Sequence, residues 1–392
     1  MTQPHPLTGV AAPPRGGHWP FLDLLRFGAA LLVLFGHTRG LLFTSFQDIP
    51  HPGLGTKVFY FLTGIHREGV AIFFAVSGFL VGGAVWRSIR ERRFDARSYL
   101  ASRFSRIYLV LLPALALALL FDWAGRFFLG GTRFFAERPL MPMSFTSDWT
   151  WPQMACNLAA MQGIFCKPLG VNPPLWSLGY EWVFYLMAPI LFGLALARFS
   201  RPARVGGIAL VLVGLGALAG PLSHWLPWLA IWLAGALAAQ IVRARELPLA
   251  AGLFGLAVVA VGFVLSRAQI VPVYTTDLMV GLGTALASAN GQLLGWCPLR
   301  RPVRIGADFS YSLYLIHVPV TVLLGGLIER FGWPSTLVVP DMAVYAAFAG
   351  LVISALVAAF LFAQLTERHT DRVRRFLLGR TSLKASAPPT PI

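Results

Sequence analysis

Long apolar blocks dominate the pattern of hydrophobic and polar positions along the 392-residue chain. About ten of these blocks reach the length that an α-helix needs to cross a bilayer. The pattern predicts membrane spans at 20–43, 58–86, 104–121, 175–197, 205–221, 224–241, 249–266, 272–290, 308–328 and 341–364. The second block is too long for one perpendicular helix, so we expect it to be tilted or broken near Gly69. The sequence therefore predicts an all-α, polytopic membrane protein.

Two polar segments border this apolar region. Residues 1–19, which are rich in Pro and Gly, are predicted to form a disordered N-terminal tail. Residues 367–392 are predicted to form a basic cytoplasmic tail, which leaves 20–366 as the transmembrane domain. The composition fits this division, because 56% of the residues are hydrophobic and only 12% are charged, too few for an ordinary soluble domain.

Basic residues in the connecting segments indicate the orientation. With the N-terminus inside, 22 of the 32 Lys and Arg residues fall in inside segments and nine fall outside, and the alternation holds over almost every loop. Both termini are therefore predicted to be cytoplasmic. The net charge of +16 comes from these short basic runs, so topology explains it and no nucleic-acid partner is expected.

The longest outside segment, 122–174, contains two cysteines. Cys156 and Cys166 have nine residues between them. On the oxidising side of a membrane such a pair forms a disulfide, whereas the alternative is two small apolar residues on a peripheral helix.

The first span carries two ionisable residues, Arg26 near its cytoplasmic end and His37 in its outer half. The eleven positions from one to the other turn a helix by about 1,100°, close to three full turns, so both side chains share one face about 16 Å apart along the axis. Ionisable groups within spans are costly and usually functional. The alternatives are an arginine that snorkels to the interface and a neutral packing histidine.

A second basic pair stands where the third span enters from the cytoplasm. Arg103 and Arg106 are three residues apart and therefore share a helix face. Arginine forks match phosphate oxygens in a bidentate way, but ordinary positive-inside anchoring explains such a pair equally well.

The fourth span carries a carboxylate close to its outer end. Glu181 lies at a depth similar to that of His37, so the histidine is a candidate partner. A carboxylate beside an imidazole favours one tautomer and raises its basicity. The alternative is a structural pair with Arg39 or Arg67.

Polar side chains also follow one face of the ninth span and a small-residue segment of the second. The ninth span presents Ser310, Tyr311, Tyr314 and His317, either as contacts between helices or as the lining of a substrate cavity. In "FFAVSGFLVGG", Ser77 and the glycines after it indicate close packing or a helix broken against a cavity.

Together these motifs resemble the acyltransferase-3 membrane proteins, which O-acylate glycans and some small molecules. The resemblance is carried by Arg26-x10-His37, "FFAVSGF" at 73–79, Arg103-x2-Arg106, "PPLWSLGYEWVFY" at 173–185 and "SYSLYLIH" at 310–317. The motifs occur in the family's order and cover most of the chain.

The resemblance implies an acyltransferase that transfers groups other than amino-acyl groups. An acyl group, usually acetyl, would pass from cytoplasmic acyl-CoA, such as acetyl-CoA, to a hydroxyl of a cell-envelope or exported glycan. His37 would be the catalytic base or a transient acyl carrier, with Glu181 and Arg26 beside it. Arg26, Arg103 and Arg106 would bind the donor. Substrate contacts are expected from Ser77, Trp176, Ser310, Tyr311, Tyr314 and His317, and no metal is expected.

The expected setting is a bacterial inner membrane, where the partners would be membrane lipid, acyl-CoA, a glycan or glycolipid acceptor and polysaccharide-assembly proteins. Two other classes of function remain open at this point. Intramembrane Arg, Glu and His also build the proton relays of transporters, although no inverted repeat is visible here. The second alternative is a non-catalytic scaffold of polysaccharide assembly.

Overall fold

The computed structural model describes residues 19–136, 149–196 and 225–379, with isolated positions between 200 and 209. Within this part of the chain, eight helical segments are long and apolar enough to cross a membrane. They are α1 (Pro20–Leu42), the α2-to-α4 run (Leu54–Arg90), α5 (Ala96–Leu129), the η3-to-α7 run (Pro173–Ala195), α9 (Trp225–Ala244), α10 (Leu249–Ala268), α13 (Arg300–Arg330) and the α14-to-α15 run (Met342–Leu377). The prediction of an all-α, multi-pass membrane protein is confirmed.

The ten predicted spans compare with the observed helices as follows. The expected span 205–221 and the predicted tail 1–19 lie largely outside the described residues, as does the second half of the predicted tail 367–392, whose first part forms η4 and α15. The expected span 272–290 is α11 (Val273–Ser288), a shorter helix of 16 residues that packs against α3, α9 and α10. The remaining elements are η1 (Phe46–Asp48), α6 (Trp151–Leu158), α12 (Gly291–Leu294), α14 (Met342–Leu365), η4 (Glu367–His369) and α15 (Thr370–Leu377).

The long second block is broken, as expected, but at another place. Helix α2 (Leu54–Thr63) ends before Gly64, and α3 (His66–Ser77) begins two residues later. Gly69 lies inside α3 and packs closely on α1. A Cβ added to Gly69 would lie 3.0 Å from the Ala29 carbonyl oxygen. A π-helical turn, η2 (Gly78–Gly82), then leads into α4 (Gly83–Arg90). Such turns are rare and recur at functional sites.

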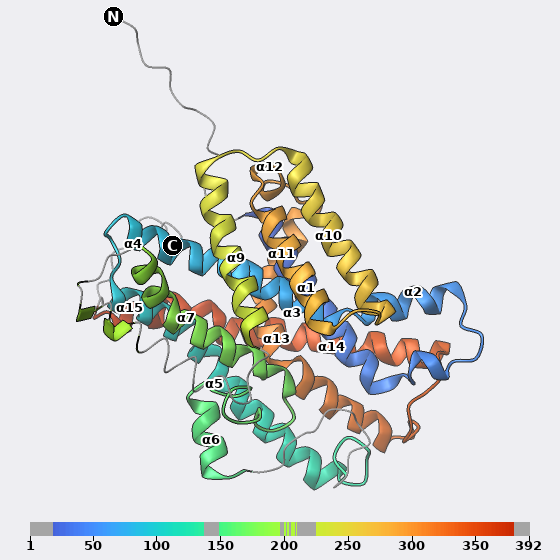
Figure 1. The fold of residues 1–392 in the computed structure, drawn as a ribbon. Helices are drawn as coiled ribbons and strands as arrows, with labels where there is room; N and C mark the ends of the chain where they lie inside the picture. The colour runs from blue at the N-terminus through green and yellow to red at the C-terminus, as the bar shows by residue number, and fades with distance from the viewer. Residues whose placement is uncertain are drawn as a thin grey trace, which may run out of the picture.

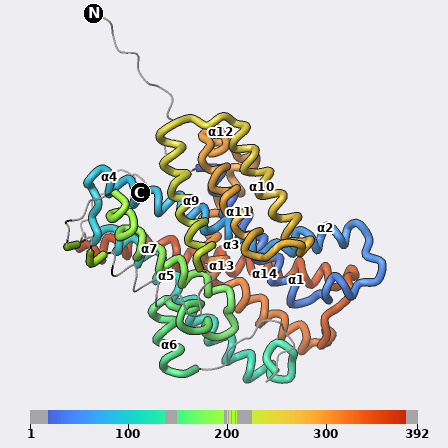
Figure 2. The backbone as a smooth tube through the Cα atoms, in the orientation of Figure 1, coloured from blue at the N-terminus to red at the C-terminus, as the bar shows by residue number. Residues whose placement is uncertain are grey.

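Helices α1, α3 and α13 form the centre of the bundle. α1 packs against both α3 and α13, and α13 also contacts α5 and α14. Helices α9, α10 and α11 stand together at the top of Figure 1, and the backbone trace in Figure 2 shows the same group. Glycines bring α9 into backbone contact with the end of α3 and the start of η2. A Cβ added to Gly78 would lie 1.9 Å from the Trp232 carbonyl oxygen, and a Cβ added to Gly235 would lie 2.0 Å from the Ala75 carbonyl oxygen.

Side-chain caps fix the start of two helices. The Asp95 carboxylate accepts hydrogen bonds from the backbone N–H groups of residues 97 and 98, which sets the start of α5. The Asp341 carboxylate likewise accepts a 2.7 Å bond from the Val344 N–H at the start of α14. Because α5 begins at this cap, Arg103 and Arg106 lie two to three turns inside the helix, beside the core.

The segment between α5 and α7 is cross-linked. Cys156 and Cys166 form a disulfide, so the paired alternative of the sequence analysis is confirmed. The Asn157 side chain, next to the cross-link, donates to the Lys167 carbonyl and accepts from the Leu169 N–H. Gly163, at a φ of +80°, turns the chain against the first turn of α7 in a conformation that favours glycine.

Candidate active site

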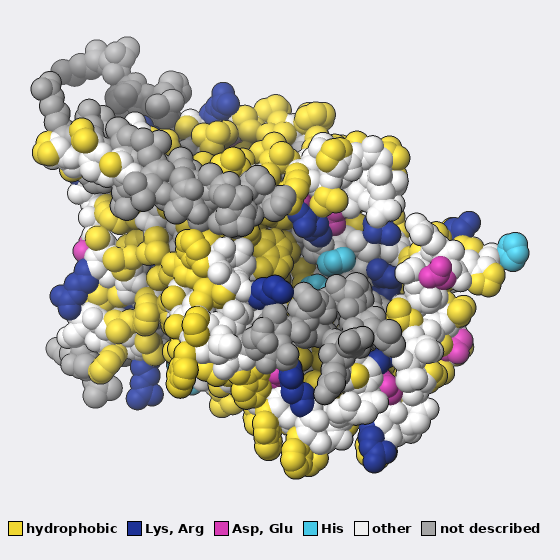
Figure 3. All heavy atoms as spheres, turned by 60° about the horizontal axis from the view of Figure 1, so that its bottom comes forward, with side chains coloured by type: hydrophobic (Ala, Val, Ile, Leu, Met, Phe, Trp, Pro, Cys, Tyr) yellow, Lys and Arg dark blue, Asp and Glu magenta, His cyan; other side chains and the backbone are white. Residues whose placement is uncertain are grey.

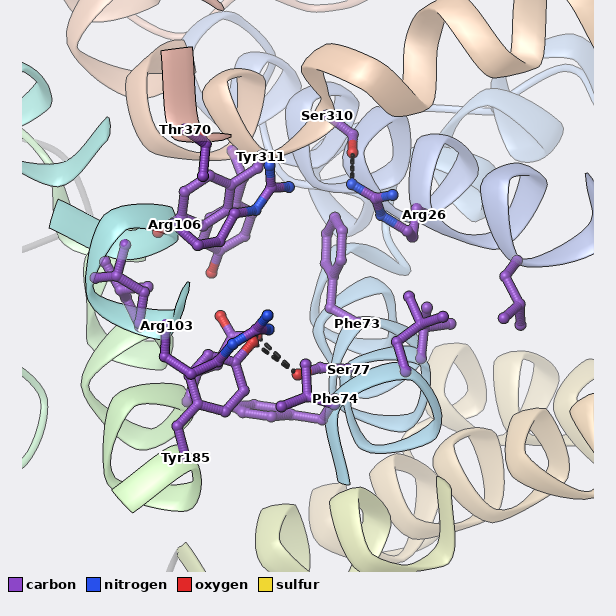
Figure 4. Close-up of a pocket in the computed structure, with 18 of the residues that line it drawn as sticks. Arg26, Phe73, Phe74, Ser77, Arg103, Arg106, Tyr185, Ser310, Tyr311 and Thr370 are labelled. Carbon is purple, nitrogen blue, oxygen red and sulfur yellow. Dashed lines mark hydrogen bonds between the residues drawn. The ribbon is translucent and has the colours of Figure 1, made fainter. Parts of the chain in front are cut away.

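A cavity of about 410 Å³ opens at the end of the bundle where α1 begins, a volume typical of small-molecule sites. Helices α1, α3, α5, α7, α13 and α15 contribute to its wall. Arg26, Arg103 and Arg106 all line it, and their guanidinium groups face one space from three sides (Figure 4). The three arginines that the sequence analysis assigned to the donor are therefore brought together by the fold.

The three guanidinium groups are not equivalent. Arg106 lies 2.7 Å from the buried Glu367 carboxylate, which neutralises much of its charge. Arg26 donates to the Ala307 carbonyl at 3.2 Å and to the Ser310 hydroxyl at 3.5 Å. In the described part of the chain, no acidic side chain forms a salt bridge with Arg103, whose Nε is buried without a hydrogen-bond partner. Arg103 is therefore the cation best placed to meet an anionic ligand.

Glu181 forms a hydrogen-bonded group on the cavity wall. Its Oε1 accepts from the Ser77 hydroxyl at 2.8 Å and from the Tyr185 hydroxyl at 2.6 Å. The Trp232 indole N–H donates to Ser77 at 3.2 Å. The expected partnership of Glu181 with His37 is therefore wrong, because nearer hydroxyls satisfy the carboxylate. Ser77 lies in the cavity wall at the end of α3, just before the π-helical turn.

The partner of His37 is another histidine. Nδ1 of His37 and Nε2 of His317 are 2.9 Å apart, and the two rings stack with their centroids 5.1 Å apart. Nδ1 of His317 lies 3.0 Å from the Leu313 carbonyl oxygen and 2.9 Å from the Tyr314 carbonyl oxygen. His317 is 1% exposed, and both of its ring nitrogens lie within hydrogen-bond distance of protein atoms.

These contacts fix the tautomers of the two neutral imidazoles. Carbonyl oxygens only accept hydrogen bonds, so the proton of His317 is on Nδ1 and its Nε2 is an acceptor. The Nδ1–H of His37 must then donate to that Nε2. Nε2 of His37 is consequently left without a proton, and its lone pair can act as a base or as a nucleophile.

The cavity does not reach the histidines: on α1 its wall ends at Arg26, eleven positions before His37, whereas on α3 and α13 it comes closer. Its wall includes Tyr314, three residues before His317 on α13, and Val70, four residues after His66 on α3. These offsets correspond to about 4.5 Å and 6 Å along a helix axis. The Phe73 ring, which meets the Tyr314 ring edge to face with centroids 5.5 Å apart, stands at this end of the cavity. A ligand that enters from the cavity must pass these two rings to reach the histidines.

The other predicted contact residues divide into two groups. Ser310, Tyr311 and Tyr314 line the cavity, and the Tyr311 hydroxyl is buried without a partner. The Tyr314 hydroxyl lies within hydrogen-bond distance of Ser177, at 2.7 Å, so this tyrosine is held in place. Trp176 is not part of the cavity wall and packs against Tyr180 and Trp228.

Several residues of the site were not predicted from the sequence. Trp19, Phe73, Tyr185 and Arg374 line the cavity, and Arg374 comes from α15, within the segment assigned to the tail. Tyr185 belongs to the motif at 173–185 and could have been chosen, since it lies one turn from Glu181. Phe73 likewise begins the motif at 73–79, whereas the sequence contains no comparable signal for Trp19 and Arg374.

Comparison with known proteins identifies the family. The acyltransferase-3 family model, described as "Acyltransferase domain", matches residues 19–365. Acyltransferase MdmB from Streptomyces mycarofaciens is 27% identical over 421 aligned positions, which cover 96% of each chain. Nodulation protein 10 from Rhizobium leguminosarum bv. viciae is 32% identical over 205 positions, which cover 51% of this chain and 50% of that protein. No solved structure matches the chain.

The family match favours an enzyme over a transporter or a scaffold. It extends from the residue before α1 to the last residue of α14, and so includes His37, His317, Arg26, Arg103 and Arg106, whereas the cavity residue Arg374 lies beyond it. The chain therefore belongs to the acyltransferase-3 family of multi-pass membrane acyltransferases.

Proposed function

We propose that this acyltransferase takes an acetyl group from cytoplasmic acetyl-CoA and transfers it to a hydroxyl of a cell-envelope or exported glycan. The observation that carries the proposal is the order of the cavity and the histidine pair along the bundle. Arginines line the cavity at the end where α1 begins, and His317, which holds His37, lies about one turn beyond the cavity residue Tyr314 on α13. A long, thin thioester with phosphates at one end matches this arrangement.

Arg103 supports the assignment of the donor side. No acidic side chain of the described residues forms a salt bridge with it, and the Tyr311 hydroxyl in the same cavity also lacks a partner. Both groups suit the phosphate oxygens of the CoA moiety. Arg26 would contribute a second cation, whereas Arg106 is held by Glu367 and mainly shapes the cavity.

His37 would perform the transfer. In the direct route, Nε2 takes the proton of the acceptor hydroxyl while the hydroxyl oxygen attacks the thioester carbonyl carbon. The C–S bond breaks, and the imidazolium gives the proton to the leaving thiolate, so that an ester and free CoA thiol result. In the alternative route, Nε2 attacks the thioester carbonyl carbon and the C–S bond breaks, so that CoA thiolate leaves. The hydroxyl oxygen then attacks the acyl-imidazole, the C–N bond breaks to restore Nε2, and the hydroxyl proton passes to the thiolate, so that an ester and free CoA thiol again result. The hydrogen bond to His317 supports both routes.

The proposed setting is a bacterial inner membrane with the N-terminus in the cytoplasm. The alternation of basic segments supports this orientation. The Cys156–Cys166 disulfide lies in the longest outside segment, and disulfides persist on the oxidising side of a membrane. The two named relatives come from bacteria.

The test uses the full chain purified in a neutral detergent, radiolabelled acetyl-CoA and an envelope extract. His37→Gln keeps the size of the side chain but lacks the base, and we expect transfer to fall by about 10²- to 10⁴-fold. His51→Gln, at an exposed loop histidine, serves as the matched control. A folded His37→Gln protein that transfers at the wild-type rate would refute the role of this residue. Label on the protein after rapid denaturation at neutral pH without acceptor would distinguish the acyl-imidazole route from direct transfer.

A further inference from the structure

A cluster of basic side chains lies beyond His37, on the side away from the donor cavity. We call it the outer cationic cluster, and its members are Arg39 of α1, His66 and Arg67 of α3, and Arg267 of α10. The His66 ring is 5.2 Å from the His37 ring between centroids. Histidine side chains are visible in a hollow of this end of the molecule, among Lys or Arg side chains (Figure 3). The cluster therefore adjoins the residue proposed to act in the transfer.

Close contacts hold the cluster together. Arg267 donates from Nη1 to the Gly64 carbonyl at 3.3 Å, at the break between α2 and α3. A Cβ on Gly64 would lie 2.7 Å from this guanidinium group, so the glycine allows Arg267 to approach. His66 packs on α1 in the same way, because a Cβ on Gly36 would lie 2.4 Å from its side chain. Three different helices thus bring these side chains to one place.

The charges of the cluster are only partly balanced. Arg67 pairs with Asp277, whose Oδ2 lies 2.8 Å from its Nη2. Among the described residues, neither Arg39 nor Arg267 forms a salt bridge with an acidic side chain. Arg39 instead lies over the Tyr60 ring, 4.8 Å from its centroid. Two positive charges therefore remain without a bound carboxylate.

Two buried nitrogen atoms in the cluster also lack hydrogen-bond partners. They are Nε of Arg39 and Nδ1 of His66. Buried polar atoms in folded proteins are nearly always paired, so such atoms in a hollow indicate a place where a ligand completes the hydrogen bonds. The setting adds to this signal, because outside segments contain few basic residues and three of the nine outside Lys and Arg side chains belong to this cluster.

We propose that the outer cationic cluster binds an oxyanion carried by the acceptor, so that the acceptor is an anionic molecule with a phosphate or carboxylate group near its reactive hydroxyl. The inference rests on the proposed function for the identity of the bound molecule as the acceptor. Arg39 and Arg267 would hold the anion through bidentate hydrogen bonds. An anion held beside His66 brings the neighbouring hydroxyl close to His37.

The first experiment tests the site without knowledge of the acceptor. The thermal unfolding midpoint of the detergent-purified full chain is measured while inorganic phosphate replaces chloride at constant ionic strength. Phosphate is expected to stabilise the wild type but not the Arg39→Gln/Arg267→Gln variant, whose affinity should be lower by on the order of tenfold per arginine. Arg267→Lys provides a milder change if the double variant does not fold, and it should weaken binding by losing the fork.

Two controls exclude other phosphate sites. Because Arg103 is itself expected to bind phosphate, coenzyme A at saturating concentration fills the donor cavity in all of these titrations. Under that condition Arg103→Gln should leave the phosphate effect unchanged. Arg330→Gln changes an exposed arginine at the outer end of α13 and should also leave it unchanged. The inference is overturned if phosphate fails to stabilise the wild type, if it stabilises all variants equally, or if the effect is lost in Arg103→Gln.

The second experiment identifies the charge of the product. Envelope material labelled by the enzyme with radioactive acetyl-CoA is applied to an anion-exchange column, and the label is expected in the retained fraction. Butanol partition of that fraction then distinguishes a lipid-borne acceptor from a soluble one. Transfer to a neutral acceptor overturns the inference but preserves the proposed function. Phosphate binding through Arg39 and Arg267 without any acyl transfer would support the anion site but overturn the proposed function.

Discussion

Replacement of His317 by Phe tests whether the histidine pair prepares His37 for catalysis. Phenylalanine keeps a planar ring at this buried position, but it has no nitrogen to accept the proton of His37 Nδ1. The 2.9 Å bond is lost, and the proton of His37 becomes free to move to Nε2. The variant therefore removes the device that leaves the lone pair on the reactive nitrogen.

The expected size of the effect follows from this one bond. The His37 ring becomes cationic when Nε2 takes a proton or an acyl group, and its Nδ1–H bond to His317 then stabilises that charge. A buried donor left without its acceptor costs about 1–3 kcal/mol. At 1.36 kcal/mol for each factor of ten, kcat should fall by about 5- to 150-fold. The KM for acetyl-CoA should not change, because Arg26 and Arg103 line the cavity on the other side of the Phe73 and Tyr314 rings.

The assay is the release of CoA thiol with labelled acetyl-CoA at saturating acceptor extract, and it gives kcat and the donor KM separately. His317→Gln is the matched variant, because its amide oxygen can accept the His37 proton, and it should recover part of the rate. A folded His317→Phe protein with wild-type kcat would refute the reasoning. Equal losses in the Phe and Gln variants would mean that His317 acts only through packing.

Three other substitutions test, one each, the donor cavity, the surroundings of His37 and the packing of the helices. Arg103→Gln should raise the donor KM by about 10- to 100-fold in a donor titration, because the charge that it removes has no bound carboxylate. Glu181→Gln should leave the acidic limb of the kcat–pH profile in place, because this carboxylate contacts Ser77 and not His37. Gly78→Ala should lower the free energy of unfolding by about 1–3 kcal/mol in thermal or denaturant unfolding, because the new methyl group meets backbone of α9 at 1.9 Å.

Each of these changes has a control in the chain. Arg97→Gln alters an exposed arginine at the start of the same helix as Arg103 and should not change the donor KM. Gly28→Ala adds a methyl group on α1 where no atom lies within 4 Å, so it should not destabilise the protein. A limb that moves to lower pH in Glu181→Gln would show that the carboxylate does act on His37, against the contacts described here.

The sequence by itself determined the membrane architecture and much of the donor cavity. A bilayer requires long apolar helices, so the spans are visible in the hydrophobic pattern. Helical periodicity also places residues on faces, which is why Arg103 and Arg106 could be assigned to one surface. The cavity contains both, together with Ser77, Glu181 and Arg26.

Only the tertiary structure decided which of these side chains meet. His37 and His317 are 280 positions apart, and Arg67 and Asp277 are 210 apart. Periodicity fixes the face of a residue on its own helix, but the rotation of that helix against its neighbours depends on packing, as where glycines let α3 and α9 touch. For this reason similar depth suggested Glu181 as the partner of His37, whereas the rotation of α13 brought in His317 and that of α7 turned Glu181 toward Ser77.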